Sequence, residues 1–226
     1  MRWTVPVVVT AAAALVLRHR MLRWGATRAE AAAEYPGDML IPDPTACSTM
    51  ATTLEAPPQA VWCWLVQMGA DRAGWYSWDR LDNGGRPSSV RIVPEWQKLR
   101  EGDRVDATVG GRTYFTVAIA DPPTTLVLRS DLALPSGRPF DPRGPLPRMF
   151  TRGVWGFHLT ELPGRRTRLV VRTIGRDAPC PVMAVADFLF GQPAHLIMQA
   201  RQFANLRRRI RADEDTAYFA DTTAPS

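Results

Sequence analysis

Few side chains in this 226-residue sequence are of the types that carry out acid–base chemistry at neutral pH. The chain has three histidines, and a histidine beside a carboxylate can transfer protons when burial adjusts its pKa. His19 only flanks an apolar run near the N-terminus. His158 falls on the face of a strand-like segment opposite Trp155, so we expect it to point to solvent. His195 lies in a helix-like segment and is the better candidate for a cavity, although a structural role is the simpler interpretation.

A second group of candidates is the aromatic segment around residues 75–79. Aromatic rings with polar tips often line apolar ligand pockets, where the polar tip orients the ligand. Packing in the core is an equally good interpretation of these rings, with Asp79 as a cap or in an ion pair, for example with Arg129 at a cavity mouth. The candidate ligand-binding residues over the whole chain are Tyr76, Trp78, Asp79, Trp96, Phe115, Trp155, Phe157, His195 and Met198.

The sequence contains no recognisable cofactor or metal motif. It has no P-loop, no GxGxxG, no GxSxG and no HExxH pattern. Its three cysteines, Cys47, Cys63 and Cys180, show no CxxC pairing and no metal spacing, and an odd number favours free thiols in a reducing compartment. We therefore expect no metal and no cofactor, and we expect no catalytic residue of an assignable type.

The net charge of +6 is carried almost wholly by arginine, with Lys98 the sole lysine. The arginines concentrate at residues 18–28 and 201–211, near the two ends of the chain. Basic proteins bind nucleic acid or anionic membranes, but no platform of interleaved aromatic and basic residues accompanies these clusters. The pattern favours a membrane surface and predicts no nucleic-acid partner; it leaves the oligomeric state open.

An apolar run of about 15 residues, Trp3–Leu17, precedes Arg18-His19-Arg20. It is shorter than the 18 or so residues that span a bilayer comfortably. A secretory signal peptide and a buried helix are alternatives, but the run leads into arginines rather than into a small-residue cleavage site. We favour an N-terminal hydrophobic anchor helix over residues 1–25, with the domain on the cytoplasmic side. A soluble cytoplasmic protein is the alternative.

The domain organisation follows from turn residues and hydrophobic periodicity. We expect a linker over residues 26–44, a folded domain over 45–212 and a flexible tail over 213–226. In the domain, a strand over Ser48–Glu55 leads through two prolines into a helix that ends at Gly69, with Gln67 between its apolar positions. A short helix over Ser77–Asp82 should have Ser77 as its N-cap.

The second half of the domain alternates as strands do. Segments 112–119, 125–130, 154–162 and 167–174 are predicted strands, the last two joined as a hairpin, and 132–148 is a predicted loop. In the first of them, Phe115, Val117 and Ile119 should share one face. Residues 181–212 have helical periodicity, with a break near residues 191–193 and an apolar stripe at Leu196, Ala200, Phe203, Leu206 and Ile210.

Several of these segments together resemble one protein family. The motifs are W-G-A-T (24–27), P-G-D (36–38), P-D-P (42–44), T-L-E-A-P-P-Q-A-V-W-C-W-L (53–65), G-W-Y-S-W-D (74–79), and I-V-P-E-W-Q (92–97) followed by G-D-R-V (102–105). This arrangement resembles an uncharacterised branch of the SRPBCC, or START-like, superfamily, which includes polyketide cyclases, lipid-transfer proteins and Bet v 1-like allergens. The resemblance implies an α+β helix-grip fold, in which a curved antiparallel sheet wraps around a long C-terminal helix.

The resemblance also implies a ligand cavity between the sheet and that helix. We expect a membrane-tethered module that binds a hydrophobic small molecule or a lipid there. One alternative is a cyclase- or dehydratase-like enzyme, with His195, or Tyr76 together with Asp79, as its weak acid–base candidates. Another is an interaction protein whose cavity is filled by its own side chains.

Overall fold

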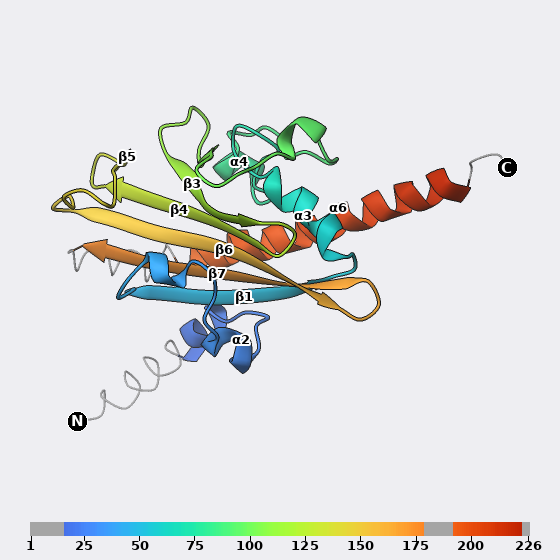
Figure 1. Cartoon of the computed structure of the whole chain (residues 1–226), viewed down its shortest axis with the longest axis horizontal. Helices are drawn as coiled ribbons and strands as arrows, with labels where there is room; N and C mark the ends of the chain where they lie inside the picture. The colour runs from blue at the N-terminus through green and yellow to red at the C-terminus, as the bar shows by residue number, and fades with distance from the viewer. Residues whose placement is uncertain (1–15, 179–191, 223–226) are drawn as a thin grey trace, which may run out of the picture.

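The computed structural model describes residues 16–178 and 192–222, and it consists of one antiparallel sheet with a long helix across one face (Figure 1). The sheet has seven strands in the order β1-β7-β6-β4-β3-β2, and β5 pairs with β4. The strands are β1 (Ala46–Leu54), β2 (Arg104–Asp106), β3 (Tyr114–Asp121), β4 (Thr125–Ala133), β5 (Arg138–Pro139), β6 (Phe150–Leu162) and β7 (Arg166–Ala178). The helices are α2 (Arg28–Ala32), η1 (Asp38–Leu40), α3 (Pro58–Val66), α4 (Asp79–Asp82), η2 (Pro94–Trp96) and α6 (Gln192–Thr222). The predicted α+β class, a curved antiparallel sheet with a C-terminal helix, is confirmed.

The main core lies between the inner face of the sheet and the helices α3 and α6. Alternating residues of β6, among them Trp155, Phe157 and Leu159, belong to it, as the period-2 pattern predicted. From α6, Phe203, Leu206 and Ile210 are at most 2% exposed, which confirms most of the predicted apolar stripe. The helix runs to Thr222, so its last ten residues occupy a stretch predicted as tail.

Helix α3 begins where the two prolines predicted it. Pro57 is the N-cap, and Pro58 occupies the first turn, where its missing N–H costs no intrahelical hydrogen bond. Gln67, which lies between the apolar positions of the helix, has a fully buried side chain. Its Nε2 donates to the Tyr76 hydroxyl (2.8 Å), and its Oε1 accepts from the backbone N–H of Val93 (3.0 Å). Gln67 thereby joins α3 to the loop that precedes η2.

Three local predictions needed correction. The β3–β4 register shifts between Val117 and Ile119, so Ile119 packs on the outer face rather than beside Phe115. Helix α4 begins at Asp79, and the Ser77 hydroxyl donates to the Met198 carbonyl (3.2 Å) instead of capping it. The predicted loop over 132–148 contains the end of β4 and all of β5.

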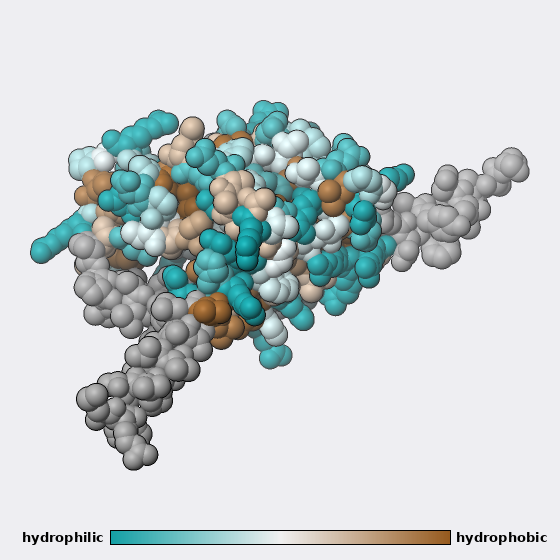
Figure 2. All heavy atoms as spheres, turned by 90° about the horizontal axis from the view of Figure 1, so that it is seen from below, coloured by the Kyte–Doolittle hydropathy of each residue, from teal (hydrophilic) through white to brown (hydrophobic). Residues whose placement is uncertain are grey.

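Residues 22–44, which comprise the end of the predicted anchor and the predicted linker over 26–44, lie along the edge and the outer face of the sheet (Figure 1). The N–H groups of Thr49 and Ala51 in edge strand β1 donate to the carbonyls of Leu22 (2.8 Å) and Trp24 (3.1 Å). An uncovered edge strand can pair with another chain, and this segment covers part of the β1 edge. Seen from below, the surface is mostly hydrophilic, with apolar atoms gathered beside this N-terminal part (Figure 2).

The outer face of the sheet needs this cover because it is also apolar. Ile41 of the segment packs with Val127, Val154 and Ile174 in a second, smaller core. Two ion pairs hold the segment in place: Glu30–Arg168 (2.6 Å) and Asp38–Arg172 (3.1 Å). Hydrogen bonds from Arg168 lower the pKa of the Glu30 carboxyl to about 2.

The same cover explains why the prediction for His158 was wrong. His158 is on the outer face, as expected, but it is 7% exposed, and its ring lies 4.7 Å from that of Tyr35. Burial is the main cause that lowers the pKa of His158 to about 4. A neutral histidine packed against an aromatic ring is a structural residue.

Among the described residues, no helix is both long and apolar enough to cross a membrane. Most of the anchor helix predicted over residues 1–25, and the predicted helix over 181–191, lie outside the described residues. Residues 16–21 are helical, and Val16 and Leu17 are more than half exposed.

Candidate functional site

A pocket of about 250 Å³ opens between the inner face of the sheet and the first turns of α6. Three parts of the chain line it: the loop and helix α4 that follow α3, the strands β3, β4, β6 and β7, and helix α6. The lining residues are Trp75, Ser77, Asp82, Phe115, Ser130, Gly153, Val154, Trp155, Thr173, His195, Met198, Gln199 and Gln202.

Two residues of a row of small residues across the sheet, Ser130 and Gly153, line this space, and the other two residues of the row line a neighbouring pocket. Ser130 of β4 pairs with Gly153 of β6, which pairs with Gly175 of β7, which pairs with Ala46 of β1. Directly opposed residues of an antiparallel sheet point to the same face, so four neighbouring positions carry almost no side chain. A Cβ at Gly153 would have its nearest neighbour at 3.7 Å, which is an ordinary contact. The glycine is therefore not required by the backbone there, and its effect is to leave the hollow open.

Three aromatic rings form one wall of the pocket. The Trp75 ring lies 5.3 Å from Trp155 and 5.6 Å from Phe115, and Phe115 lies 6.0 Å from Trp155, measured between centroids. The Trp75 Nε1–H donates to the Ala107 carbonyl (3.2 Å), which fixes that indole from behind. Rings held at these distances and tilts offer a preformed surface to a flat apolar group.

Among the described residues of the lining, Asp82 supplies the one carboxylate. Both of its oxygens are shielded from solvent, and neither has a hydrogen-bond partner among the described residues. Burial, with a contribution from the nearby Asp79 carboxylate, raises the pKa of Asp82 to about 6. Asp82 can therefore change its protonation state near neutral pH.

Helix α6 closes the pocket with polar side chains. His195 Nε2 lies 3.3 Å from the Thr173 hydroxyl of β7. Gln202 accepts from Gln199 Nε2 (2.8 Å) and donates to the Trp75 carbonyl (2.9 Å), which ties α6 to the aromatic wall. The remaining acceptor of Gln199, its Oε1, is buried without a partner in the described structure.

Of the nine residues predicted to bind ligand, four line the pocket: Phe115, Trp155, His195 and Met198. Phe157 is fully buried, 4.9 Å from the Trp155 ring on the side of the core.

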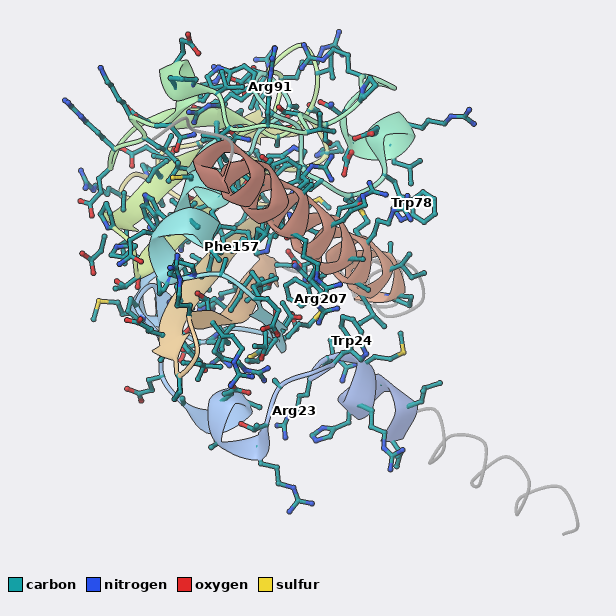
Figure 3. The ribbon with its side chains drawn as sticks, turned by 90° about the vertical axis from the view of Figure 1, so that its right-hand side faces the viewer. Arg23, Trp24, Trp78, Arg91, Phe157 and Arg207 are labelled. Atoms are coloured by element: carbon teal, nitrogen blue, oxygen red, sulfur yellow. The ribbon has the colours of Figure 1, made fainter. Side chains whose placement is uncertain are left out.

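The other four predicted residues have structural contacts outside the pocket. Tyr76 is fully buried under Arg209, whose guanidinium lies 4.8 Å from the ring centroid, and burial raises the pKa of the Tyr76 hydroxyl. Trp78 lies at the surface beside α6, with Arg201 over its ring at 4.9 Å (Figure 3). The Trp96 carbonyl accepts from Arg72 (2.5 Å).

Asp79 has neither the pocket position nor the partner that the sequence suggested. Its Oδ1 accepts from the backbone N–H (3.1 Å) and the hydroxyl (2.5 Å) of Ser88. Arg129 pairs with Asp131 (2.6 Å). The two candidates are thus in separate networks, and Tyr76 and Asp79 do not form an acid–base pair in the pocket.

The sequence reasoning missed Asp82 and Gly153. Asp82 was predicted as the last residue of a short helix, just before the turn Asn83-Gly84-Gly85, and no ligand-binding role was predicted for it. Gly153 directly precedes the predicted strand over 154–162 and lies inside the observed β6, and glycine in a strand often marks a close approach of another group. That was the available indication of the pocket.

No cluster of three or more histidine, cysteine, aspartate or glutamate side chains suited to a metal ion occurs in the parts of the chain that the structure covers. The two cysteines in those parts, Cys47 and Cys63, are free.

Comparison with protein-family models found no match, and comparison with curated proteins found none either. Solved structures that resemble the chain include a Nitrosomonas europaea protein (12% identity, 79% of this chain and 99% of that one, TM-score 0.45). A Mesorhizobium loti protein matches at 19% identity over 74% of this chain and 98% of that one (TM-score 0.41). DynU16, from the dynemicin biosynthetic locus, matches at 18% identity over 74% of this chain and 48% of its own (TM-score 0.41). At such values these likenesses assign neither a family nor a function to this chain.

Proposed function

We propose that this protein binds a small apolar molecule in the pocket between the sheet and α6. The observation that carries the proposal is the pair Ser130–Gly153 on adjacent strands, which leaves a hollow directly beside the wall of Trp75, Phe115 and Trp155. A filled core would place large side chains at such positions, as the rest of the inner face does. The superfamily that the sequence resembles holds its ligands in this same place.

The size of the pocket limits the ligand. Ligand sites usually enclose about 300 to 1,000 Å³, so a pocket of about 250 Å³ suits a molecule of one or two rings better than a long lipid chain. Burying such a molecule against the aromatic wall would supply roughly 25 cal/mol for each Å² of apolar surface removed from water.

The test is a side chain that fills the hollow. Gly153→Leu adds a side chain above the sheet where a Cβ is tolerated, whereas Gly144→Leu adds the same group in an exposed loop as the control. We expect native mass spectrometry of the full chain to show a bound compound in wild type and in Gly144→Leu, and none in Gly153→Leu. A compound retained by a folded Gly153→Leu would place the binding site elsewhere.

Acid–base catalysis is the second candidate function. The observation that favours it is the presence of Asp82, with its pKa raised to about 6, and His195 in the lining of one pocket. A catalyst would change the extracted compound when the two are mixed again, whereas a binding module would return it unaltered.

Attachment to a membrane stays a prediction from the sequence. The apolar residues exposed at the N-terminal end of the described chain, Val16, Leu17 and Trp24, and the arginines between them are compatible with contact to a bilayer. Removal of residues 1–15 tests this prediction.

A further inference from the structure

The charge inside the pocket differs in sign from the charge of the chain. The protein has 28 basic and 22 acidic residues, but neither arginine nor lysine is among the described residues that line the pocket. Asp82 is the sole carboxylate there, and His195 is the other titratable group. The pocket therefore offers an acidic group to a ligand and no fixed cation.

The Asp82 carboxylate has no counter-charge in the described structure. By geometry its two oxygens lack a hydrogen-bond partner in the described structure. The Asp79 carboxylate raises the pKa of Asp82, and the Ser77 hydroxyl and the backbone N–H groups of Trp78 and Asp82 lower it by less than burial raises it. A buried carboxylate without a partner is unfavourable, and a cationic donor placed against it would relieve that cost. The Oε1 of Gln199, which has no partner in the described structure, can also accept a hydrogen bond from a donor on the ligand.

The faces of the rings in the aromatic wall also favour a cation, while the buried Trp155 Nε1–H, which has no partner in the described structure, suits an acceptor on the ligand. Indole and phenyl rings attract a cation to their faces, most strongly where water is excluded. Elsewhere in the described chain arginines occupy this position, over Tyr35, Tyr76, Trp78 and Tyr114. Among the described residues no arginine lies over Trp75, Phe115 or Trp155, and the parts of these rings that line the pocket can contact a ligand.

On the basis of the proposed function, we propose that the ligand is a small ring-containing amine that carries a positive charge. Its ammonium group is placed against Asp82 and its apolar ring against Trp75, Phe115 and Trp155. The same arrangement disfavours fatty acids, phospholipids and other anionic ligands, because the described pocket lining offers them an acidic group and no cation. This narrows the hydrophobic small molecule or lipid expected from the sequence to one chemical class.

The experiment compares three probes of one shape and different charge: 2-phenylethylamine, 2-phenylethanol and 3-phenylpropionate. The indole N–H signals of the full chain, labelled with ¹⁵N in its eight tryptophans, report binding. Trp155→Phe and Trp75→Phe spectra assign the two signals from the pocket. At about pH 7.5 we expect the amine to shift the Trp155 signal with an affinity about tenfold or more above that of the alcohol, and 3-phenylpropionate to bind weakest.

Asp82→Asn tests the carboxylate itself, since it keeps the size of the side chain and removes the charge. The amine should lose about tenfold or more in affinity while the alcohol binds as before. Glu95→Gln removes the same charge from an exposed position and should leave all three affinities unchanged.

The outcomes separate the two proposals. Equal binding of the amine and the alcohol in wild type, or an amine preference that survives in Asp82→Asn, would overturn the assignment of an amine and leave the binding pocket standing. Failure of all three probes to shift the Trp155 signal would count against both. Loss of every shift in Gly153→Leu, with the other tryptophan signals unchanged, would confirm that the probes occupy this pocket.

Discussion

The pKa values of single side chains in this protein depend on which segments bury them. Burial shifts the pKa values of Asp82 and His158 in opposite directions. It disfavours the charged form of each group, which is the deprotonated form of the acid and the protonated form of the base. The pKa of His158 falls to about 4, so the ring is neutral near pH 7. That of Asp82 rises to about 6, so the carboxyl is mostly ionised near pH 7 and becomes neutral in mild acid.

Asp82→Asn should stabilise the ligand-free protein at neutral pH and not in acid. The folded pKa of about 6 lies above the ordinary 3.8, so between these values the folded state holds a proton that the unfolded state has lost. The contribution of Asp82 to stability therefore falls as pH rises from about 4 to 6. Thermal unfolding at about pH 7.5 should show a gain on the order of 1 kcal/mol for the variant, discounted because the residue is partly exposed.

The control for this prediction is the same pair of proteins at about pH 4.5, where wild-type Asp82 is protonated and the gain should largely disappear. Comparing variant with wild type at each pH cancels the contribution of His158, whose effect on stability rises with pH over the same range. An equal gain at both pH values would show that Asp82 is not the titrating group.

At the scale of elements, the N-terminal segment acts as an extra partner for the β1 edge. Its backbone reaches β1 only because residue 25 is glycine, with φ at +74° and a Cβ position 2.1 Å from the Ala51 carbonyl oxygen. Trp24 next to it stacks on Phe203 of α6 at 6.1 Å, and Figure 3 shows it beside that helix, near Arg207. One short segment thus contacts both the sheet edge and the C-terminal helix.

Gly25→Ala should separate the segment from β1. The added methyl group overlaps the Ala51 carbonyl, so we expect a loss of about 2 kcal/mol or more in the free energy of unfolding. In hydrogen exchange, the Thr49 and Ala51 amides should exchange faster than in wild type. Gly85→Ala is the matched control, since its φ is +82° but nothing lies within 4 Å of the new Cβ; it should cost about 1 kcal/mol and leave those amides protected.

On the scale of the whole molecule, the sheet is covered on both faces by unequal layers. The inner layer, α3 and α6, surrounds the main core and the pocket. The outer layer is the N-terminal segment, which covers the smaller core of Ile41, Val127, Val154 and Ile174. A folded unit that began at residue 45, as predicted, would leave that apolar patch exposed to water.

Two truncations distinguish the outer layer from the apolar run that precedes it. Removal of residues 1–44 should lower the melting temperature by on the order of 10 °C or cause aggregation, because it removes Ile41 and the partners of Arg168 and Arg172. Removal of residues 1–15 should leave the melting temperature within a few degrees of that of the full chain. Similar melting curves for all three proteins would refute a structural role for the segment.

The shorter truncation also tests membrane attachment without disturbing the fold. If the run anchors the protein, the full chain should fractionate with membranes and the form lacking residues 1–15 should not. The same distribution for both forms would show that the run is no anchor.

The elements that the sequence determined by itself are those whose pattern is local. The hairpin of β6 and β7 follows from strict alternation, α3 from two prolines ahead of an apolar stripe, and the inner face of α6 from Phe203, Leu206 and Ile210 at helical spacing. These patterns, together with the family resemblance, predicted the fold class, and two of the three rings of the aromatic wall, Phe115 and Trp155, were among the predicted ligand-binding residues.

Only the tertiary structure decided what lies between the elements. The hollow depends on Ser130 and Gly153 meeting on two strands, and that register is set by the pairing of segments far apart in the chain. The burial of His158 and the isolation of Asp82 likewise depend on which distant segment covers each side chain. The hydrophobic periodicity of the sequence does not predict these features. Solvent access and pKa depend on all the groups that surround a side chain in the folded protein, not only on its neighbours in sequence.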